Sequence, residues 1–480
     1  MVHATHGGRR VAFSADEQRN ALEAIDRLYS AIKRTRPMVV HPSSPVGKCG
    51  QCGRRDAAGP REWNPWRDFQ RDLESRDEIE KGHRLDKGER LCGVCLLKRF
   101  GGYLSDPSFP STSEIASAEW RSGASEHEDL ASLLNAWEKQ ARKVETEDPY
   151  PLLYKRTLDR RKAEAAAAGD AERIRATLES IAALASTIES KHPHLPVKPS
   201  NYLAVVTFDG DSMGAKIQAH PRSLPPALMK FSRSLAPILR SHRATAFYLG
   251  GDEGLILCPI ETCLGLAGEI RRAFDNAVHQ AMPDLDEPIT ISAGVAIFDR
   301  ERPLAAAIQA ARDALRAAKD LDEDKNALGV TVTTASGNSW TALDHWGAGW
   351  TRVFEAVDLA RAGRLSSGWA YDIEELLEKM PVDFLQTSTA REALGAEIRR
   401  ITGRRLVRPT KTRANGPSRN TDADETVPPA RRLDGWATFS ADAQTGHMAG
   451  QLHLVAFLLR ESEPAGVEEV ALGTQSEVAR

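Results

Sequence analysis

Two short acidic motifs near the middle of the chain carry residue types that bind divalent metal ions. Residues 209–211 (Asp-Gly-Asp) follow an apolar run at 202–208 with the composition of a buried strand. Residues 250–253 (Gly-Gly-Asp-Glu) separate two short apolar runs, and a glycine turn between such runs predicts a β-hairpin. If the hairpin pairs beside the first strand, the carboxylates of Asp209, Asp252 and Glu253 reach one edge of a sheet.

Clustered carboxylates repel one another unless divalent cations lie between them. Two such ions stabilise the attacking and leaving oxygens of an in-line displacement at a phosphate. We therefore expect Asp209, Asp252 and Glu253 to be catalytic residues that bind Mg²⁺ or Mn²⁺ in a nucleotidyltransferase. The alternative for Asp209 is that it only ends the strand through an Asx-turn.

The segments around the motifs predict the fold that positions them. The loop 212–214 contains glycine and leads towards an amphipathic helix with Leu224 and Leu239 on its apolar face, and free N–H groups at such a loop can hold phosphates. Apolar patterns then predict a helix at 264–282, a strand at 289–297, a helix starting at 303 and a final strand near 329–334. This order predicts an α+β fold, a ferredoxin-like palm in which helices cover an antiparallel sheet.

Four cysteines form two CxxC pairs before the palm, which are Cys49, Cys52, Cys92 and Cys95. Thiolate pairs at this spacing fit a tetrahedral structural zinc site, and four cysteines leave no position open for water or substrate. Because the gap between the pairs exceeds the usual spacing, His83 or His41 in place of one cysteine stays an alternative. Disulfides are disfavoured, since no signal peptide is visible and we expect a cytoplasmic protein with reduced thiols.

Length and composition set the remaining bounds. A chain of 480 residues with 41% hydrophobic residues can bury the cores of two to four domains, and no apolar run has transmembrane length. The formal charge of −3 argues against a surface that is basic all over, so any RNA contact must use local patches.

The chain is predicted to be multidomain, with a zinc-binding helical domain and a C-terminal helical domain flanking the palm. The expected parts are an N-terminal helix and linker at 1–45, the zinc-binding and helical domain at 46–200, the palm at 201–340 and the C-terminal helical domain at 341–480. Within the last part, the polar stretch near 408–432 is predicted to be a disordered loop.

Three strings in this order and spacing resemble the catalytic palm of the CRISPR polymerase family. They are FDGDSMG (208–214), LGGDEGLIL (249–257) and SAGVAIFDRERPLAAAIQAARDALRAAK (292–319). The closest likeness is to the second palm of the large signalling subunit of type III CRISPR effector complexes, in its Cmr-type branch; diguanylate cyclases share the plan more distantly. KGERLCGVCLLKRF (87–100) resembles the family's zinc insertion, and GQLHLVAFLLRE (450–461) its C-terminal helical domain.

The resemblance implies synthesis of cyclic oligoadenylates from ATP with Mg²⁺ or Mn²⁺, after a guide RNA has captured target RNA. It implies that Asp209 and Glu253 bind the metals directly, with Asp252 also at the site. Residues expected to contact the nucleotide are Gly210, Asp211, Ser212, Gly250, Gly251 and Lys319. For Lys319 the alternative is a solvated lysine at a helix end, favoured by the helix dipole.

The sequence also departs from the family pattern. Glu253 stands where the family usually has a second aspartate, although diguanylate cyclases have glutamate there. Gly254 replaces the phenylalanine of those cyclases, which makes a cyclic di-GMP enzyme the less favoured reading. The first forty-five residues resemble neither the family's His-Asp nuclease domain nor its first palm, so a second palm must come from another subunit or a homodimer.

Two alternatives to the complex-bound enzyme follow. One is a non-catalytic scaffold subunit that binds nucleotide and neighbouring subunits. The other is a stand-alone dimeric cyclic-nucleotide synthase in antiviral defence.

Overall fold

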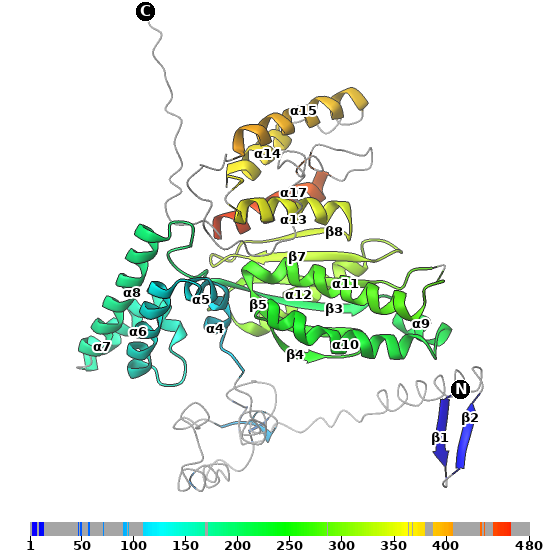
Figure 1. Ribbon diagram of the computed structural model, residues 1–480, viewed down its shortest axis with the longest axis horizontal. Helices are drawn as coiled ribbons and strands as arrows, with labels where there is room; N and C mark the ends of the chain where they lie inside the picture. Colours follow the sequence, from blue (N-terminus) through cyan, green and yellow to red (C-terminus); the bar gives the residue numbers. More distant parts are fainter. Residues whose placement is uncertain are drawn as a thin grey trace, which may run out of the picture. The chain divides into compact units, whose positions relative to one another are not determined.

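The chain divides into two compact units, with the boundary between Pro110 and Ser111 apart from Val2. The computed structural model describes residues 2–6, 9–13, 109–168, 171–285, 287–362, 364–366, 368–379, 387–406 and 445–461, and positions 47, 49, 56, 57, 71, 90–93, 95, 433 and 436. In the N-terminal part, β1 (Val2–His6) and β2 (Arg9–Phe13) form a two-stranded sheet (Figure 1). This hairpin was not predicted, although a Gly-Gly pair at 7–8 is a hairpin signal in the sequence.

The second unit is built on a six-stranded sheet in the order β4-β5-β3-β6-β7-β8 (Figure 1). The strands are β3 (Tyr202–Gly210), β4 (Thr245–Leu249), β5 (Glu253–Pro259), β6 (Ile291–Asp299), β7 (Ala327–Thr333) and β8 (Ser339–His345). The predicted pairing of a strand with a hairpin is confirmed, because β3 lies antiparallel to β5 and β5 to β4. The predicted α+β class is confirmed as well.

The sheet differs from the expected antiparallel palm in two ways. β6 and β7 are parallel, because α12 (Leu304–Lys319) connects them as a crossover helix. β8 extends the sheet beyond the strand expected to be last. Its pattern is a weak strand signal, since Ala342 is its only residue classed as buried.

Helices cover both faces of the sheet. α10 (Leu224–Ser241) and α11 (Cys263–Ala281) pack against each other on one face, where the Phe231 ring meets the rings of Phe208 and Phe274 edge to face. On the other face, α12 and α4 (Thr112–Ala116) pack against the alternate residues of the same strands. The two apolar faces of β3 explain why its sequence is an unbroken apolar run.

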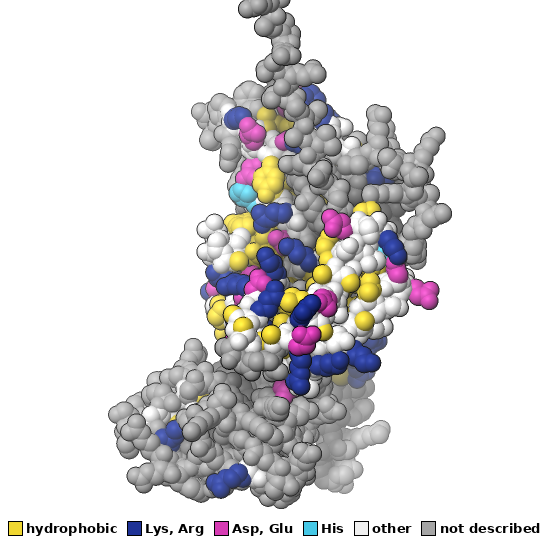
Figure 2. All heavy atoms as spheres, turned by 90° about the vertical axis from the view of Figure 1, so that its left-hand side faces the viewer, with side chains coloured by type: hydrophobic (Ala, Val, Ile, Leu, Met, Phe, Trp, Pro, Cys, Tyr) yellow, Lys and Arg dark blue, Asp and Glu magenta, His cyan; other side chains and the backbone are white. Residues whose placement is uncertain are grey.

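The predicted helical region before the palm is confirmed. It contains α5 (Ala118–Ser125), α6 (Glu128–Val144), the 3₁₀ helix η3 (Tyr150–Leu153), α7 (Lys155–Ala168) and α8 (Ala171–Lys191). Figure 2, which looks onto the side of the molecule where Figure 1 shows α6, α7 and α8, has positive and negative side chains interspersed.

Helices also follow the palm, as predicted. They are α13 (Ala348–Arg361), α14 (Gly368–Glu378), α15 (Ser388–Arg405) and α17 (Thr445–Glu461). Phe457 of α17 meets Tyr202 and Trp340 edge to face, which joins these helices to the sheet. The N-terminal helix expected within residues 1–45, which the apolar pattern places at 15–35, lies outside the described residues, and so does the loop expected at 408–432. Among the described residues, no helix is long and apolar enough to cross a membrane.

Candidate active site at the palm hairpin

The pairing of the central strand brings Asp209 and Glu253 together. Asp209 lies directly opposite Glu253 of β5 on one side and opposite Ser292 of β6 on the other. Directly opposed residues of an antiparallel pair share a face, with Cβ atoms about 4.5–5.5 Å apart. Both carboxylates therefore lie on the face that α12 covers, at the end of β3.

The glycine turn brings Asp252 to the same place. The Gly250 amide donates to the Glu253 carbonyl at 2.7 Å and closes the hairpin. The Gly210 amide donates to the Asp252 carbonyl at 3.1 Å, so the turn is bonded to the end of β3. A Cβ on Gly250 would lie 2.9 Å from Cγ of Glu253, and glycine there leaves room for that side chain.

Gly254 has a packing reason of its own. It lies directly opposite Phe208, and a Cβ on Gly254 would lie 2.5 Å from the Phe208 ring. The ring fills the space beside the turn, so the glycine that distinguishes this hairpin from that of diguanylate cyclases is required by the neighbouring strand.

Lys319 reaches the site because α12 lies unusually close to the sheet. A Cβ on Gly294 of β6 would lie 2.2 Å from the carbonyl oxygen of Ala311, and one on Gly329 of β7 would lie 2.5 Å from that of Ala314. At the end of this helix, Lys319 Nζ donates to Asp209 Oδ2 at 2.5 Å and to the Gly210 carbonyl at 2.9 Å. The Lys319 side chain is 20% exposed, so the alternative of a solvated lysine is wrong.

Asp211 is the centre of a buried network. Its carboxylate accepts from the hydroxyls of Thr290 at 2.8 Å and Ser292 at 2.9 Å, and from the Asn326 amide at 3.2 Å. Lys319 Nζ lies 3.6 Å from Oδ1 of Asp211, the oxygen that accepts from Ser292 at 2.9 Å. A carboxylate that is 4% exposed and accepts these bonds holds the loop, and the network disfavours the predicted contact of Asp211 with nucleotide.

The backbone around Asp211 is strained. Ser212, Lys325 and Asn326 have φ of 54°, 56° and 42°, in the left-handed region that non-glycine residues seldom adopt. Ser212 precedes the short helix α9 (Met213–Ala219) but makes no side-chain cap bond to it. Its hydroxyl instead accepts from Lys325 Nζ at 3.1 Å, so the Ser212 side chain does not cap α9.

The electrostatics at the turn suit a cation. Burial raises the pKa of Asp252, and the neighbouring charges of Asp209 and Glu253 raise this pKa further. Carboxylate oxygens are the ligands that Mg²⁺ and Mn²⁺ prefer, so this donor set fits the expected ions. Among the described residues, the carboxylate oxygens of these three side chains do not all lie within 4.8 Å of one another, and Asp209 is bonded to Lys319.

Some residues at the site were not predicted from the sequence. Thr290, Ser292, Lys325 and Asn326 contact Asp211 or Ser212 from segments about eighty to 115 positions away in the chain. The one signal that could have indicated Ser292 is a polar residue inside an otherwise apolar strand, where a buried hydroxyl needs a partner.

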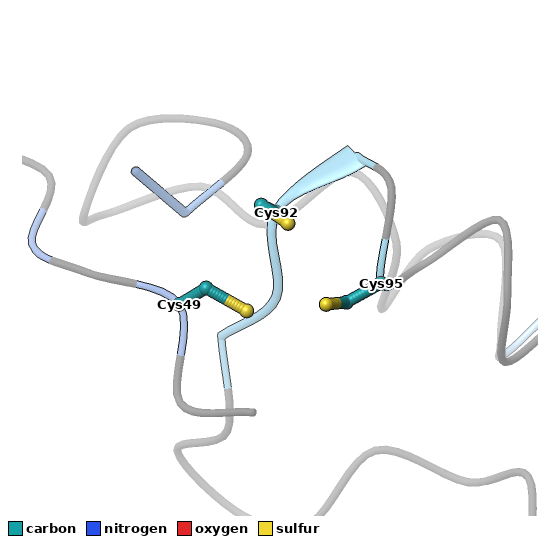
Figure 3. Close-up of side chains that lie close together, drawn as sticks. All are labelled: Cys49, Cys92 and Cys95. Atoms are coloured by element: carbon teal, nitrogen blue, oxygen red, sulfur yellow. The ribbon is translucent and has the colours of Figure 1, made fainter. Parts of the chain in front are cut away.

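The first unit holds a separate candidate metal site. Cys49, Cys92 and Cys95 are buried, and their sulfur atoms lie within 4.8 Å of one another and point towards a common centre (Figure 3). A zinc–sulfur bond of about 2.3 Å places tetrahedral sulfur ligands roughly 3.8 Å apart, so three of the predicted ligands fit a zinc ion. Cys52, His41 and His83 lie outside the described residues, so the choice of the fourth ligand stays a prediction.

Comparison with known proteins adds a family to this geometry. Residues 202–329 match the family model for the second palm domain of Cas10/Cmr2. The chain is also similar to the CRISPR system Cmr subunit Cmr2 of Pyrococcus furiosus, with 26% identity over 178 residues that cover 31% of this chain and 20% of that protein. The chain thus matches only about a fifth of the length of this curated relative.

Solved structures give distant likenesses. A chain of the type III-B Cmr-beta complex bound to cognate target RNA has 14% identity and a TM-score of 0.49, over 84% of this chain and 59% of that one. A chain of the Csm1-Csm4 cassette in complex with pppApA has 18% identity and a TM-score of 0.27, over 37% of this chain and 28% of that one.

Proposed function

We propose that this chain is a metal-dependent nucleotidyltransferase. Its residues 202–329 match the second palm domain of Cas10/Cmr2, as the resemblance to the CRISPR polymerases predicts. Its substrate is ATP and its product a cyclic oligoadenylate signal. It acts within a type III CRISPR effector complex, with the other effector subunits, guide RNA and target RNA as partners. The observation that supports this most is the direct pairing of Asp209 with Glu253 beside Lys319.

In this proposal Asp209 and Glu253 bind Mg²⁺ or Mn²⁺, with Asp252 at the same turn. When bound, the ions stabilise the attacking and leaving oxygens at the reacting phosphate. Lys319 neutralises Asp209 until a cation binds, and its ammonium group is then available to a phosphate oxygen. Gly250 and Gly251 expose backbone where a nucleotide can approach, while Asp211 keeps the loop in place.

The zinc site has a structural part in the proposal. Cys49, Cys92 and Cys95, with Cys52 as the predicted fourth ligand, hold one Zn²⁺ that stabilises the N-terminal unit. Binding free energy at such a site contributes directly to folding.

The test of catalysis uses Asp209→Ala and Glu253→Ala, with Asp284→Ala as a control at an exposed carboxylate. Each site variant should lose at least about 100-fold in product formation, because changing even a residue that only hydrogen-bonds to a metal ligand costs about 10–100-fold. Products from each nucleoside triphosphate are separated by chromatography and identified by mass spectrometry, with partner subunits and target RNA present. Glu253→Asp should keep activity, since it retains a carboxylate at the turn.

A specific observation also favours the scaffold alternative. Lys319 already neutralises Asp209, so the site can persist without metal and without turnover. If the unchanged chain binds ATP, seen as a rise in its melting temperature, but consumes no nucleotide in the full complex, the scaffold function replaces the catalytic one. Equal activity of the parent chain and Asp209→Ala would also overturn the catalytic proposal.

A further inference from the structure

Three histidines come together among the helices that precede the palm, in a part of the sequence outside the acidic motifs. His127 immediately precedes α6, His192 follows α8, and His194 lies in the linker between α8 and β3. One ring nitrogen of each lies within 4.8 Å of the other two. The ring centroids are 4.2 Å apart for His127 and His192, 5.6 Å for His127 and His194, and 6.0 Å for His192 and His194.

This donor set has the chemistry of a transition-metal site. Neutral imidazole nitrogen suits Zn²⁺, Ni²⁺ and Cu²⁺, whereas Mg²⁺ and Ca²⁺ prefer oxygen. A zinc–nitrogen bond of about 2.0–2.1 Å places tetrahedral nitrogen ligands roughly 3.4 Å apart. Side-chain rotations that move each nitrogen by about an ångström would bring the three histidines to that spacing.

The surroundings supply an orienting group and negative charge. Asp129 Oδ1 lies 3.1 Å from His192 Nε2, and histidine ligands of metals usually donate their second N–H to such a carboxylate. This bond leaves Nδ1 of His192 to the metal. A surface hollow beside the cluster is lined by Glu126, His127, Glu128, Asp129 and Ser132, so three carboxylates lie next to His127. Lys191, 3.7 Å from Asp129, is the opposing positive charge.

The position of the cluster gives the metal a structural consequence. The segment that contains His192 and His194 leads from α8 into β3, and Trp120 Nε1 donates to the Pro196 carbonyl of this linker at 2.9 Å. The Leu195 amide donates to the His192 carbonyl at 2.9 Å, which folds both histidines into one turn. A metal held there would tie the start of α6 to the linker that enters the palm.

We propose that His127, His192 and His194 bind one divalent transition-metal ion, with Zn²⁺ as the expected occupant and water as the fourth ligand. The ion fixes the linker between α8 and β3. This site is separate from the cysteine site and from the palm carboxylates, and the proposal does not depend on nucleotide turnover.

The test compares the full chain without an affinity tag to His192→Gln/His194→Gln, with His279→Gln as a control at an exposed histidine on α11. After equilibration with Zn²⁺ and removal of excess metal, elemental analysis should find one more zinc per chain in the parent and in the control than in the double variant. Addition of Zn²⁺ to chelator-treated protein should raise the melting temperature of the parent more than that of the variant.

Substitution of Co²⁺ for Zn²⁺ shows whether the ion that the double variant lacks was bound by histidines or by cysteines. Thiolate ligands give Co²⁺ near-ultraviolet charge-transfer absorption that imidazoles do not, so the double variant should keep that absorption and lose only visible d–d intensity. Equal zinc content in the parent and the double variant would overturn the proposal. His194 is exposed, so the single change His194→Gln should leave the circular dichroism spectrum unchanged. It should weaken zinc binding at least about tenfold. An unchanged zinc affinity of this variant would also contradict the proposal.

Discussion

At the hairpin turn, the ionised form of Asp252 is unfavourable in the folded protein. Burial is the main cause that raises the pKa of Asp252 above the value it has in the unfolded chain. The negative charges of Asp209 and Glu253 raise this pKa further. The folded state therefore binds this proton more tightly than the unfolded state. It follows that ionised Asp252 destabilises the metal-free fold above the raised pKa, and that the cost disappears below the unfolded value.

We predict that Asp252→Asn raises the melting temperature of chelator-treated protein at pH 7.5 by roughly 1–4 °C. This range allows for solvent screening of a half-exposed group, since about 1 kcal/mol moves the melting temperature of a domain of this size by about 2–4 °C. The gain should shrink as the pH falls through the raised pKa and vanish near pH 3.5. Scanning calorimetry across this range measures it, with the exposed Asp284→Asn as control. A lower melting temperature at pH 7.5, or a gain independent of pH, would show that the charge of Asp252 is not the cause.

At the scale of elements, the approach of α12 to β6 decides where Lys319 lies. A Cβ on Gly294 would meet backbone atoms, the Ala311 carbonyl oxygen at 2.2 Å and the Leu315 nitrogen at 2.3 Å, and these cannot turn aside as a side chain can. The helix would have to lift from the sheet and carry Lys319 away from Asp209.

We predict that Gly294→Ala destabilises the palm by about 1–3 kcal/mol, the usual cost of an overpacked core. Chemical denaturation measures this change in the free energy of unfolding. The matched control is Gly403→Ala in α15, where a Cβ meets no atom within 4 Å and alanine should be neutral or add up to about 1 kcal/mol. Equal effects of the two substitutions would rule out the close contact as the cause.

The elements that the sequence predicted well are those whose signals are local. β3, the β4–β5 hairpin and α12 follow from apolar runs, a glycine turn and a helical period, and antiparallel pairing then places Asp209 opposite Glu253. Bonds from distant segments have no such signal. The Asn326 amide that holds Asp211 belongs to a loop 115 positions away, and its left-handed backbone could not be read from an asparagine alone.

At the scale of the molecule, the C-terminal helices support the loop beside the candidate active site. Trp346, just after β8, donates from its indole to the Ile291 carbonyl at 3.0 Å and from its amide to the Asn326 carbonyl at 2.9 Å. Gln451 of α17 donates to Asp344 of β8 at 3.0 Å. These hydrogen bonds connect α17 to the loop that holds Asp211 through the end of β8.

The last prediction concerns the number of palms. The part of the chain that the structure describes contains one palm sheet, and the proposed ring synthesis joins nucleotides across two facing palms. We therefore expect the isolated monomer to turn over ATP at least about 100-fold more slowly than the chain with its partner palm, because positioning two reactants accounts for a large part of a catalysed rate. If a homodimer supplies the second palm, activity per chain should instead rise in proportion to protein concentration below the dimer dissociation constant.

Initial rates over a hundredfold range of protein concentration, paired with light scattering, distinguish these cases. If the rate of ATP turnover per chain is low at every protein concentration and rises only when the partner subunits are added, the enzyme acts in the effector complex. A concentration-dependent rate with a matching dimer favours the stand-alone synthase. Full activity in a sample that scatters as a monomer at every concentration would contradict the need for a second palm, since both nucleotides would then have to bind and react at the single carboxylate site beside Lys319.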